Sequence, residues 1–119
     1  MAIVGAHVLL YTREAERLRE TLRDVLGWDS VEGHDPPDGW LIFELPPAEL
    51  GVHPGETPRH EFTLMCDDLK STMAELGEKG IEFRGEPRDR GFGIVTTMVL
   101  PGGIEVLLYE PKHKSPLAL

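Results

Sequence analysis

Cysteine is nearly absent from this sequence, since Cys66 is the only one among 119 residues. A single cysteine excludes an internal disulfide and leaves no partner for a cysteine-based zinc motif. A free thiol of this kind is typical of a reducing compartment, so we expect a cytoplasmic protein. Long apolar runs are lacking too: no stretch approaches the ~18 residues of a membrane span, and no signal-peptide pattern is recognisable. We therefore expect no membrane partner.

Positive charge is also scarce, with 12 Lys and Arg residues against 21 Asp and Glu and a net charge of -9. An acidic surface repels nucleic acids and anionic lipids, so we expect neither as a partner. A small neutral or cationic molecule is the kind of ligand that this balance favours. The apolar share of 40% is ordinary for a globular protein, and the length suits one domain spanning residues 1–119.

The two halves of the chain follow the same pattern. Residues 7–26 and residues 61–80 both begin as an extended apolar stretch, become polar, and continue as an amphipathic helix that stops near a glycine. We place the repeats at about residues 3–54 and 59–111. A unit of about 55 residues would be marginally stable alone, so the halves should share a core or exchange between two chains.

Hydrophobic periodicity predicts one helix and four strands in each half. The first helix has apolar residues at spacings of three and four from Ala15 to Leu26, and the second carries Leu69, Met73 and Leu76 on one face. Short apolar runs bounded by proline and glycine predict the strands. These cover residues 3–11, 28–32, 39–45 and 48–53, then 60–66, 81–84, 92–100 and 104–109, with a charged loop at 85–91. The resulting α+β fold has two βαβββ repeats that form one cupped mixed sheet with the helices outside.

Three segments give the sequence a family resemblance. Residues 5–14 read Gly-Ala-His-Val-Leu-Leu-Tyr-Thr-Arg-Glu and lead into a helix that ends Val-Leu-Gly-Trp; residues 64–69 read Leu-Met-Cys-Asp-Asp-Leu; residues 100–105 read Leu-Pro-Gly-Gly-Ile-Glu. They resemble the vicinal oxygen chelate superfamily, which includes glyoxalase I, extradiol dioxygenases, fosfomycin resistance enzymes and bleomycin-binding proteins. The resemblance implies the double βαβββ fold. It also implies a homodimer, because cups in this family are often completed between chains.

The resemblance further implies a metal site built from the first and last strands of the units. His7 is at the first-strand position of repeat one, and Glu61 is at that of repeat two, where many relatives have histidine. Two alignments of the last strand remain open, and they put either Glu105 or Leu107 at the ligand position. Both residues would lie on the same strand face. If a divalent ion is bound, we expect His7, Glu61 and Glu105 to hold it, and Zn, Ni, Mn or Fe suits these donors.

A metal in this site would act as a Lewis acid on a small substrate that binds through two oxygens. Glu105 would be the catalytic residue that moves a proton, which implies a lyase or an isomerase. A dioxygenase would need a second histidine in the cup, and only His53 or an out-of-register His60 could supply it, so we rank that activity lower. The residues leave open whether the chain is an enzyme.

The alternative is a metal-free module that binds and sequesters a drug or a cationic aromatic compound. Its walls would be Tyr11, Met65, Met98 and Tyr109, with carboxylates as anchors for a cation. The same side chains would be ordinary core if the cup is filled. The two hypotheses differ in one geometric requirement. Metal catalysis needs three metal-competent side chains that converge, whereas a binding module needs only a roomy pocket.

Overall fold

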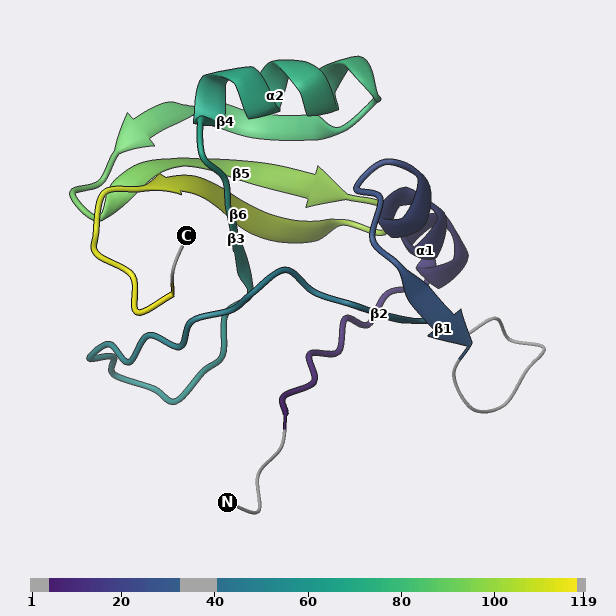
Figure 1. The fold of residues 1–119 in the computed structure, drawn as a ribbon, viewed down its shortest axis with the longest axis horizontal. Coiled ribbons are helices and arrows are strands. Elements are labelled where there is room, and N and C mark those ends of the chain that lie inside the picture. Colours follow the sequence, from purple (N-terminus) through teal and green to yellow (C-terminus); the bar gives the residue numbers. More distant parts are fainter. Residues whose placement is uncertain (1–4, 33–40, 118–119) are drawn as a thin grey trace.

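The computed structural model describes residues 5–32 and 41–117. Its main element is a mixed sheet of four strands in the order β3-β6-β5-β4 (Figure 1). Strand β3 runs parallel to β6, and the other neighbours are antiparallel. Helix α2 (Leu69–Glu78) follows β3 along the chain, and the strands are β3 (Thr63–Met65), β4 (Glu82–Asp89), β5 (Gly93–Leu100) and β6 (Ile104–Pro111). The second half of the chain thus forms the complete βαβββ unit that its sequence predicts.

The first half forms one helix and one hairpin within the described residues. Helix α1 (Ala15–Asp24) precedes β1 (Ser30–Glu32) and β2 (Leu41–Phe43), which pair antiparallel as a separate two-stranded sheet. Leu18 and Leu22 are the buried residues of α1, as its apolar stripe predicts. Parts of the predicted strands 3–11 and 39–45, namely residues 3–4 and 39–40, lie outside the described residues. The α+β class is confirmed.

The predicted strand at residues 48–53 is absent. Leu50 and Val52 have no strand partner in the described part of the chain, and they are 90% and 93% exposed. A contact of Glu49, the residue before Leu50, accounts for the missing strand. Its carboxylate accepts a hydrogen bond of 2.7 Å from the hydroxyl of Ser115. This contact holds the segment against the C-terminal tail and away from the edge of β2.

The described part of the predicted first strand, residues 5–11, forms no ladder either. Tyr11 is 82% exposed, and Val8 and Leu9 are about half exposed. The hydroxyl of Thr12 donates a 3.2 Å hydrogen bond to the carbonyl of Gly102 in the β5–β6 turn. The end of this segment is therefore tied to a hairpin turn and not to the edge of a sheet.

Strand β4 is longer than predicted, because residues 85–89 of the expected charged loop continue it. The pairing with β5 shifts register between Arg84 and Arg88, and Gly85 in this bulge has φ of 86°. Bulges of this kind use a glycine in the left-handed region. The charged residues made the segment look like a loop, although they lie on an exposed edge strand.

Helix α2 is fixed at its start by side chains from two directions. The carboxylate of Asp68 accepts a hydrogen bond from the backbone N–H of Ser71 at 3.4 Å, which caps the helix. The N–H of Leu69, a residue only 2% exposed, donates to Glu110 Oε1 at 2.9 Å. The second bond attaches α2 to β6.

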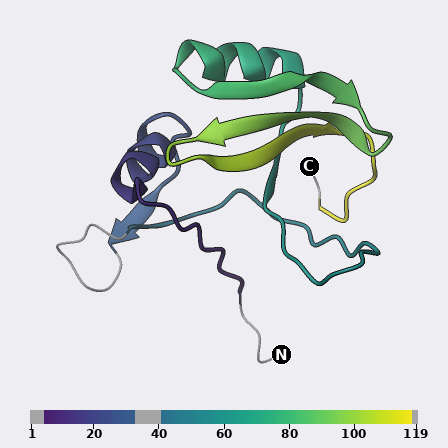
Figure 2. The same cartoon turned by 180° about the vertical axis from the view of Figure 1, so that it is seen from behind.

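Both helices pack on one face of the four-stranded sheet. Met98 pairs with Val106 in the β5–β6 ladder, and these residues form the main core with Leu100 and the two buried leucines of α1. Glu110, which holds the start of α2, lies on the same face as Val106 by strand alternation. The C-terminal tail and the segment after β2 lie on the opposite side of the sheet from α2. Figure 1 shows this arrangement, and Figure 2 shows it from behind. No helix in the described chain is long and apolar enough to cross a membrane.

Candidate functional site

The described chain contains a cavity of about 480 Å³ bordered by α1, β2 and residues 6–10. We call it the α1 pocket. Its walls are mainly apolar: Trp28, Phe43 and Phe62 each contribute an aromatic ring, and α1 contributes its buried leucines. Small-molecule sites have volumes of about 300–1,000 Å³ and walls of this composition. The α1 pocket therefore has the size and lining of a ligand-binding site.

The turn after α1 places Trp28 in the wall. Gly27 has φ of 73°, a left-handed conformation that few other residues adopt easily. The chain reverses there, and the N–H of Trp28 donates to the carbonyl of Leu22 at 3.1 Å. The indole therefore lies beside the helix that precedes it. The glycine that stops the helix is the local signal for this arrangement.

Three polar side chains interrupt the apolar lining: His7, Arg19 and Glu44. Glu44 directly follows β2, and its N–H donates to the carbonyl of Asp29 at 2.9 Å, which extends the hairpin. A few polar groups in an apolar pocket are the usual means of orienting a ligand. These polar side chains can thus form hydrogen bonds or ion pairs with a bound molecule, in addition to the apolar contacts that the pocket offers.

Of the residues that the sequence suggested as ligand contacts, none lines the α1 pocket. Tyr11 lies outside it and is exposed, and Met98 is fully buried in the core beneath the helices, with 0% exposure. Met65 and Tyr109 lie directly opposite each other in the β3–β6 ladder, on the sheet face that is not covered by helices. Trp28, Phe43 and Phe62 were missed because their pattern alone does not distinguish a pocket wall from core.

The proposed metal ligands are spread over the chain. His7 lines the α1 pocket, the carboxylate of Glu61 lies 3.2 Å from the guanidinium of Arg59, and Glu105 forms an ion pair with Arg84. Within residues 5–32 and 41–117, no group of three His, Cys, Asp or Glu side chains is arranged to hold a metal ion. These donors do not fit a metal in the single chain, and metal dependence stays a prediction of the resemblance.

The last strand shows how Glu105 and Leu107 are related. Leu107 pairs with Thr63 of β3, and Glu105 pairs with Val99 of β5. Both lie on the face of β6 that carries Tyr109, as strand alternation predicts. Only Leu107 is opposite a residue of β3, while Glu105 lies beyond the end of that short strand.

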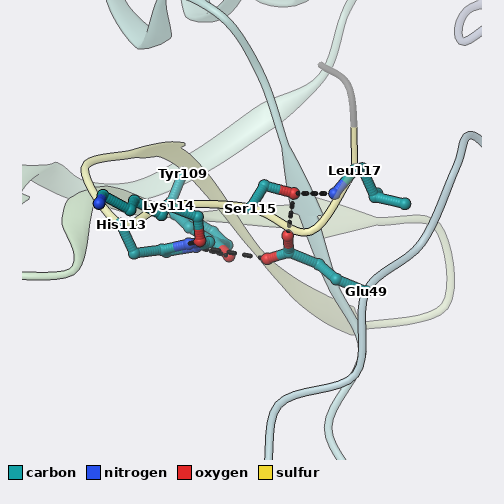
Figure 3. A network of polar contacts seen from close by, with 6 residues as sticks. All are labelled: Glu49, Tyr109, His113, Lys114, Ser115 and Leu117. Carbon is teal, nitrogen blue, oxygen red and sulfur yellow. Dashed lines mark hydrogen bonds and ion pairs between the residues drawn. The ribbon is translucent and has the colours of Figure 1, made fainter.

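A polar cluster joins the tail to the segment after β2, and we call it the tail network (Figure 3). Tyr109 and His113 approach at 3.0 Å between the hydroxyl and Nε2, and His113 Nε2 lies 3.4 Å from Glu49. Ser115 donates to the other oxygen of Glu49 and accepts from the N–H of Leu117 at 3.0 Å. Burial, with a smaller contribution from Glu49, raises the pKa of the Tyr109 phenol. The network therefore holds a neutral phenol and a carboxylate together on the open face of the sheet.

Comparisons with known proteins agree on the family. The family model named Glyoxalase/Bleomycin resistance protein/Dioxygenase superfamily matches residues 6–113. The fold is similar to that of TnmS3, an antibiotic binding protein from Streptomyces sp. CB03234, with 21% identity, a TM-score of 0.68, and coverage of 94% of this chain and 99% of that one. A superfamily member from Sphaerobacter thermophilus DSM 20745 has 21% identity, a TM-score of 0.65, and coverage of 92% and 99%. The search of curated proteins found no match. Since the family model spans nearly the whole sequence, this chain belongs to the glyoxalase/bleomycin resistance protein/dioxygenase superfamily.

Proposed function

We propose that this protein binds a small planar aromatic molecule in the α1 pocket. The observation that carries the proposal is the lining of a cavity of about 480 Å³ by three aromatic rings. Aromatic rings gain from offset or edge-to-face packing on a second ring, in addition to the burial of apolar area. A ligand of two or three fused rings would use this wall fully.

The net charge of the chain indicates which ligand charge is favoured. A net charge of -9 favours the approach of a cation over that of an anion. Glu44 in the pocket wall would accept a hydrogen bond from a cationic or neutral donor. We therefore propose a neutral or cationic aromatic ligand. The similarity in fold to an antibiotic binding protein supports a binding role over an unoccupied scaffold.

Tryptophan fluorescence tests this proposal. In a Trp40→Phe background Trp28 is the only tryptophan, so its emission reports directly on the pocket. We would titrate three naphthalenes that differ in charge: a 2-naphthylmethylammonium, 2-naphthol and naphthalene-2-sulfonate. The expected result is saturable quenching by the first two and little by the sulfonate. Absence of quenching by all three would refute the pocket as an aromatic site.

A matched pair of variants locates the binding. Phe62→Ala removes a ring from the pocket wall, whereas Tyr11→Ala removes a ring of similar size that the sequence suggested as a contact but that lies outside. Phe62→Ala should weaken binding about tenfold, which corresponds to about 1.4 kcal/mol, and Tyr11→Ala should leave it unchanged. A larger loss of affinity in Tyr11→Ala than in Phe62→Ala would contradict a site at α1. Elemental analysis of the same wild-type sample, before and after loading with divalent ions, tests the separate prediction of a metal.

We also propose that two copies associate through β3. Among the described residues, strand β3 has a neighbour on one edge only, and its sequence Thr63–Met65 is uncharged. The other edge strand, β4, is charged and exposed along nearly its whole length and contains Pro87, features that discourage pairing. Leu50 and Val52 have exposed apolar side chains, and contact with a second copy would cover them.

Lysine substitutions at the two edges distinguish them. Thr63→Lys places a charge on the proposed pairing edge, and Glu86→Lys places the same side chain on β4. Sedimentation velocity should show a dimer for the wild type and Glu86→Lys, and a monomer for Thr63→Lys. A dimer that survives Thr63→Lys would rule out β3 as the interface.

A further inference from the structure

The tail network brings three metal-competent side chains together from three parts of the chain (Figure 3). Tyr109 belongs to β6, His113 to the C-terminal tail, and Glu49 to the segment that follows β2. The phenol oxygen of Tyr109 lies 3.0 Å from His113 Nε2, and the same nitrogen lies 3.4 Å from Glu49 Oε1. None of the three belongs to the set of metal ligands that the family resemblance implies. The cluster is therefore a separate candidate site.

The second ring nitrogen of His113 determines how the imidazole can bind. His113 Nδ1 lies 2.8 Å from the backbone carbonyl of Lys114, and a carbonyl can only accept a hydrogen bond. Nδ1 therefore carries the ring proton, and Nε2 of the neutral ring has the lone pair. Histidines that bind metals hold their other nitrogen in this way. Nε2 is thus the nitrogen that can bind a cation, and it is the one beside the two oxygens.

The contact between His113 and Glu49 lacks a positive group between its two atoms. A neutral Nε2 and a carboxylate oxygen are both acceptors, so neither can donate to the other. Their separation of 3.4 Å exceeds the usual length of a charge-assisted hydrogen bond, about 2.7–2.9 Å. Two ligands of a tetrahedral zinc ion, each at about 2.0–2.1 Å, lie about 3.3 Å apart. The separation therefore fits one cation shared by the two side chains better than a direct bond.

Glu49 is held in the way that ligand carboxylates are held. Its side chain is only 17% exposed, and Ser115 donates a hydrogen bond of 2.7 Å to the oxygen that does not contact His113. The N–H of Leu117 donates to the Ser115 hydroxyl in turn. Carboxylates that bind metals are fixed by hydrogen bonds of this kind. The tail therefore supplies one ligand and positions a second.

The surrounding charges favour a cation. Lys112, the neighbour of His113 in sequence, is paired with Asp89, so its charge is balanced by another carboxylate. The net charge of -9 attracts cations to the chain as a whole. Burial raises the pKa of the Tyr109 phenol, so this group is neutral before metal binding. A bound dication favours the anionic form of its ligands, so the phenol would release its proton to solvent when the ion binds.

We propose that Tyr109, His113 and Glu49 bind one zinc ion, which fastens the C-terminal tail to β6 and to the segment after β2. One imidazole nitrogen with two oxygen donors suits zinc, and three protein ligands leave a fourth position for water. The walls of the α1 pocket include none of these residues, so the zinc site is independent of the aromatic ligand proposed there.

The zinc content of matched histidine variants tests the site. Untagged protein would be dialysed against zinc chloride and then against metal-free buffer, and zinc would be measured by elemental mass spectrometry. We expect about one zinc ion per chain in the wild type and in His53→Ala, and a nearly complete loss in His113→Ala. His53 is the matched control, because its Nδ1 also contacts a backbone carbonyl, that of Pro54 at 2.7 Å, but in an exposed segment. Wild-type protein without zinc, or His113→Ala with full zinc content, would overturn the proposal.

Two further variants distinguish this site from the one that the family resemblance implies. Zinc should be retained in His7→Ala and lost in Glu49→Gln, with circular dichroism showing that both variants are folded. Retention in Glu49→Gln would overturn the tail network as the site. Loss of zinc from folded His7→Ala would contradict it as well, because His7 is not among the three proposed ligands.

Tyrosine absorption gives a readout that a purely structural contact would not produce. In Tyr11→Phe protein, Tyr109 is the only tyrosine, and zinc at neutral pH should produce the ultraviolet difference spectrum of a phenolate. Ser115→Ala releases one oxygen of Glu49 and should weaken zinc binding about 10–100-fold, with the phenolate spectrum retained at saturation. Zinc-loaded Tyr11→Phe without a phenolate spectrum would overturn the proposed ligand set.

Discussion

Replacing Gly102 with alanine should detach the start of α1 from the β5–β6 turn. Gly102 has φ of 85°, and a Cβ added there would overlap the hydroxyl of Thr12 and lie 2.8 Å from its Cβ. That hydroxyl donates to the Gly102 carbonyl and accepts from the N–H of Glu14, both at 3.2 Å. The substitution therefore strains one turn and disrupts the contact that positions the helix.

The expected cost is about 2–3 kcal/mol. A left-handed conformation costs alanine about 1–2 kcal/mol, and loss of the Thr12 hydrogen bond adds about 1 kcal/mol. For a domain of this size, about 1 kcal/mol corresponds to about 4 °C in Tm, so Gly102→Ala should lower Tm by about 8–12 °C. Because α1 forms a wall of the α1 pocket, binding of the naphthalene probes should weaken as well.

A double-mutant cycle tests the cause. Thr12→Gly removes every Thr12 side-chain atom that the new methyl group would meet. In that background Gly102→Ala should cost only its conformational part, so the coupling between the two substitutions should be about 1 kcal/mol. Urea unfolding followed by far-ultraviolet circular dichroism measures all four proteins. Additivity within about 0.5 kcal/mol would refute the claim that these residues determine each other's packing.

Three other results follow from the same structure. Met98→Ala should lower the free energy of unfolding by about 2–5 kcal/mol, while Met98→Leu should cost less than about 1.5 kcal/mol and leave probe affinity unchanged, since Met98 is fully buried. Burial raises the pKa of the Cys66 thiol, so its alkylation at pH 8 should be slower than that of an unstructured cysteine; equal rates would contradict this. Lys112 and the Gly91 N–H lower the pKa of Asp89 in the folded protein. The stability that these two contacts add should be present above the ordinary carboxyl pKa. It should be lost as the pH falls through the lowered pKa of the folded state. Titration by NMR should show a higher Asp89 pKa in Lys112→Met.

The second half was predictable because its signals are local. The Pro101-Gly102-Gly103 turn fixes the β5–β6 hairpin, Asp68 caps α2, and strand alternation divides β6 into a core face and an open face. Each of these features depends on residues close together in sequence. The error at residues 85–89 arose because charge on an exposed edge strand resembles charge in a loop. The strand predicted at residues 60–66 is also shorter in the structure, where β3 is Thr63–Met65.

The first half was less predictable because its arrangement depends on distant residues. The contact of Thr12 with Gly102 and that of Glu49 with Ser115 join parts of the chain that are far apart in sequence. Neither pair has a local pattern that marks it. Apolar alternation at residues 48–53 predicted a strand that the structure does not have, because alternation carries no information about which partner a segment has.

The candidate site was missed for a related physical reason. Among the carboxylates and histidines proposed as metal ligands, His7, Glu61 and Glu105, only His7 lines the α1 pocket. The aromatic walls come from a turn residue, Trp28, a strand residue, Phe43, and Phe62 from the start of the second half. A residue looks the same in sequence whether its ring meets another side chain or a cavity. Only the packing distinguishes these cases.

The unequal halves give the pocket its properties. The second half forms a sheet whose strands are paired over most of their length, and α1 is anchored on it through Leu18 and Leu22. Residues 6–10, which form one border of the pocket, lack strand partners within the described chain. Segments of low local stability are the ones that can open at small cost. A ligand that fills the pocket stabilises the state it binds by RT ln(1 + [L]/Kd), so binding would stabilise the weaker half on a scaffold that is already stable.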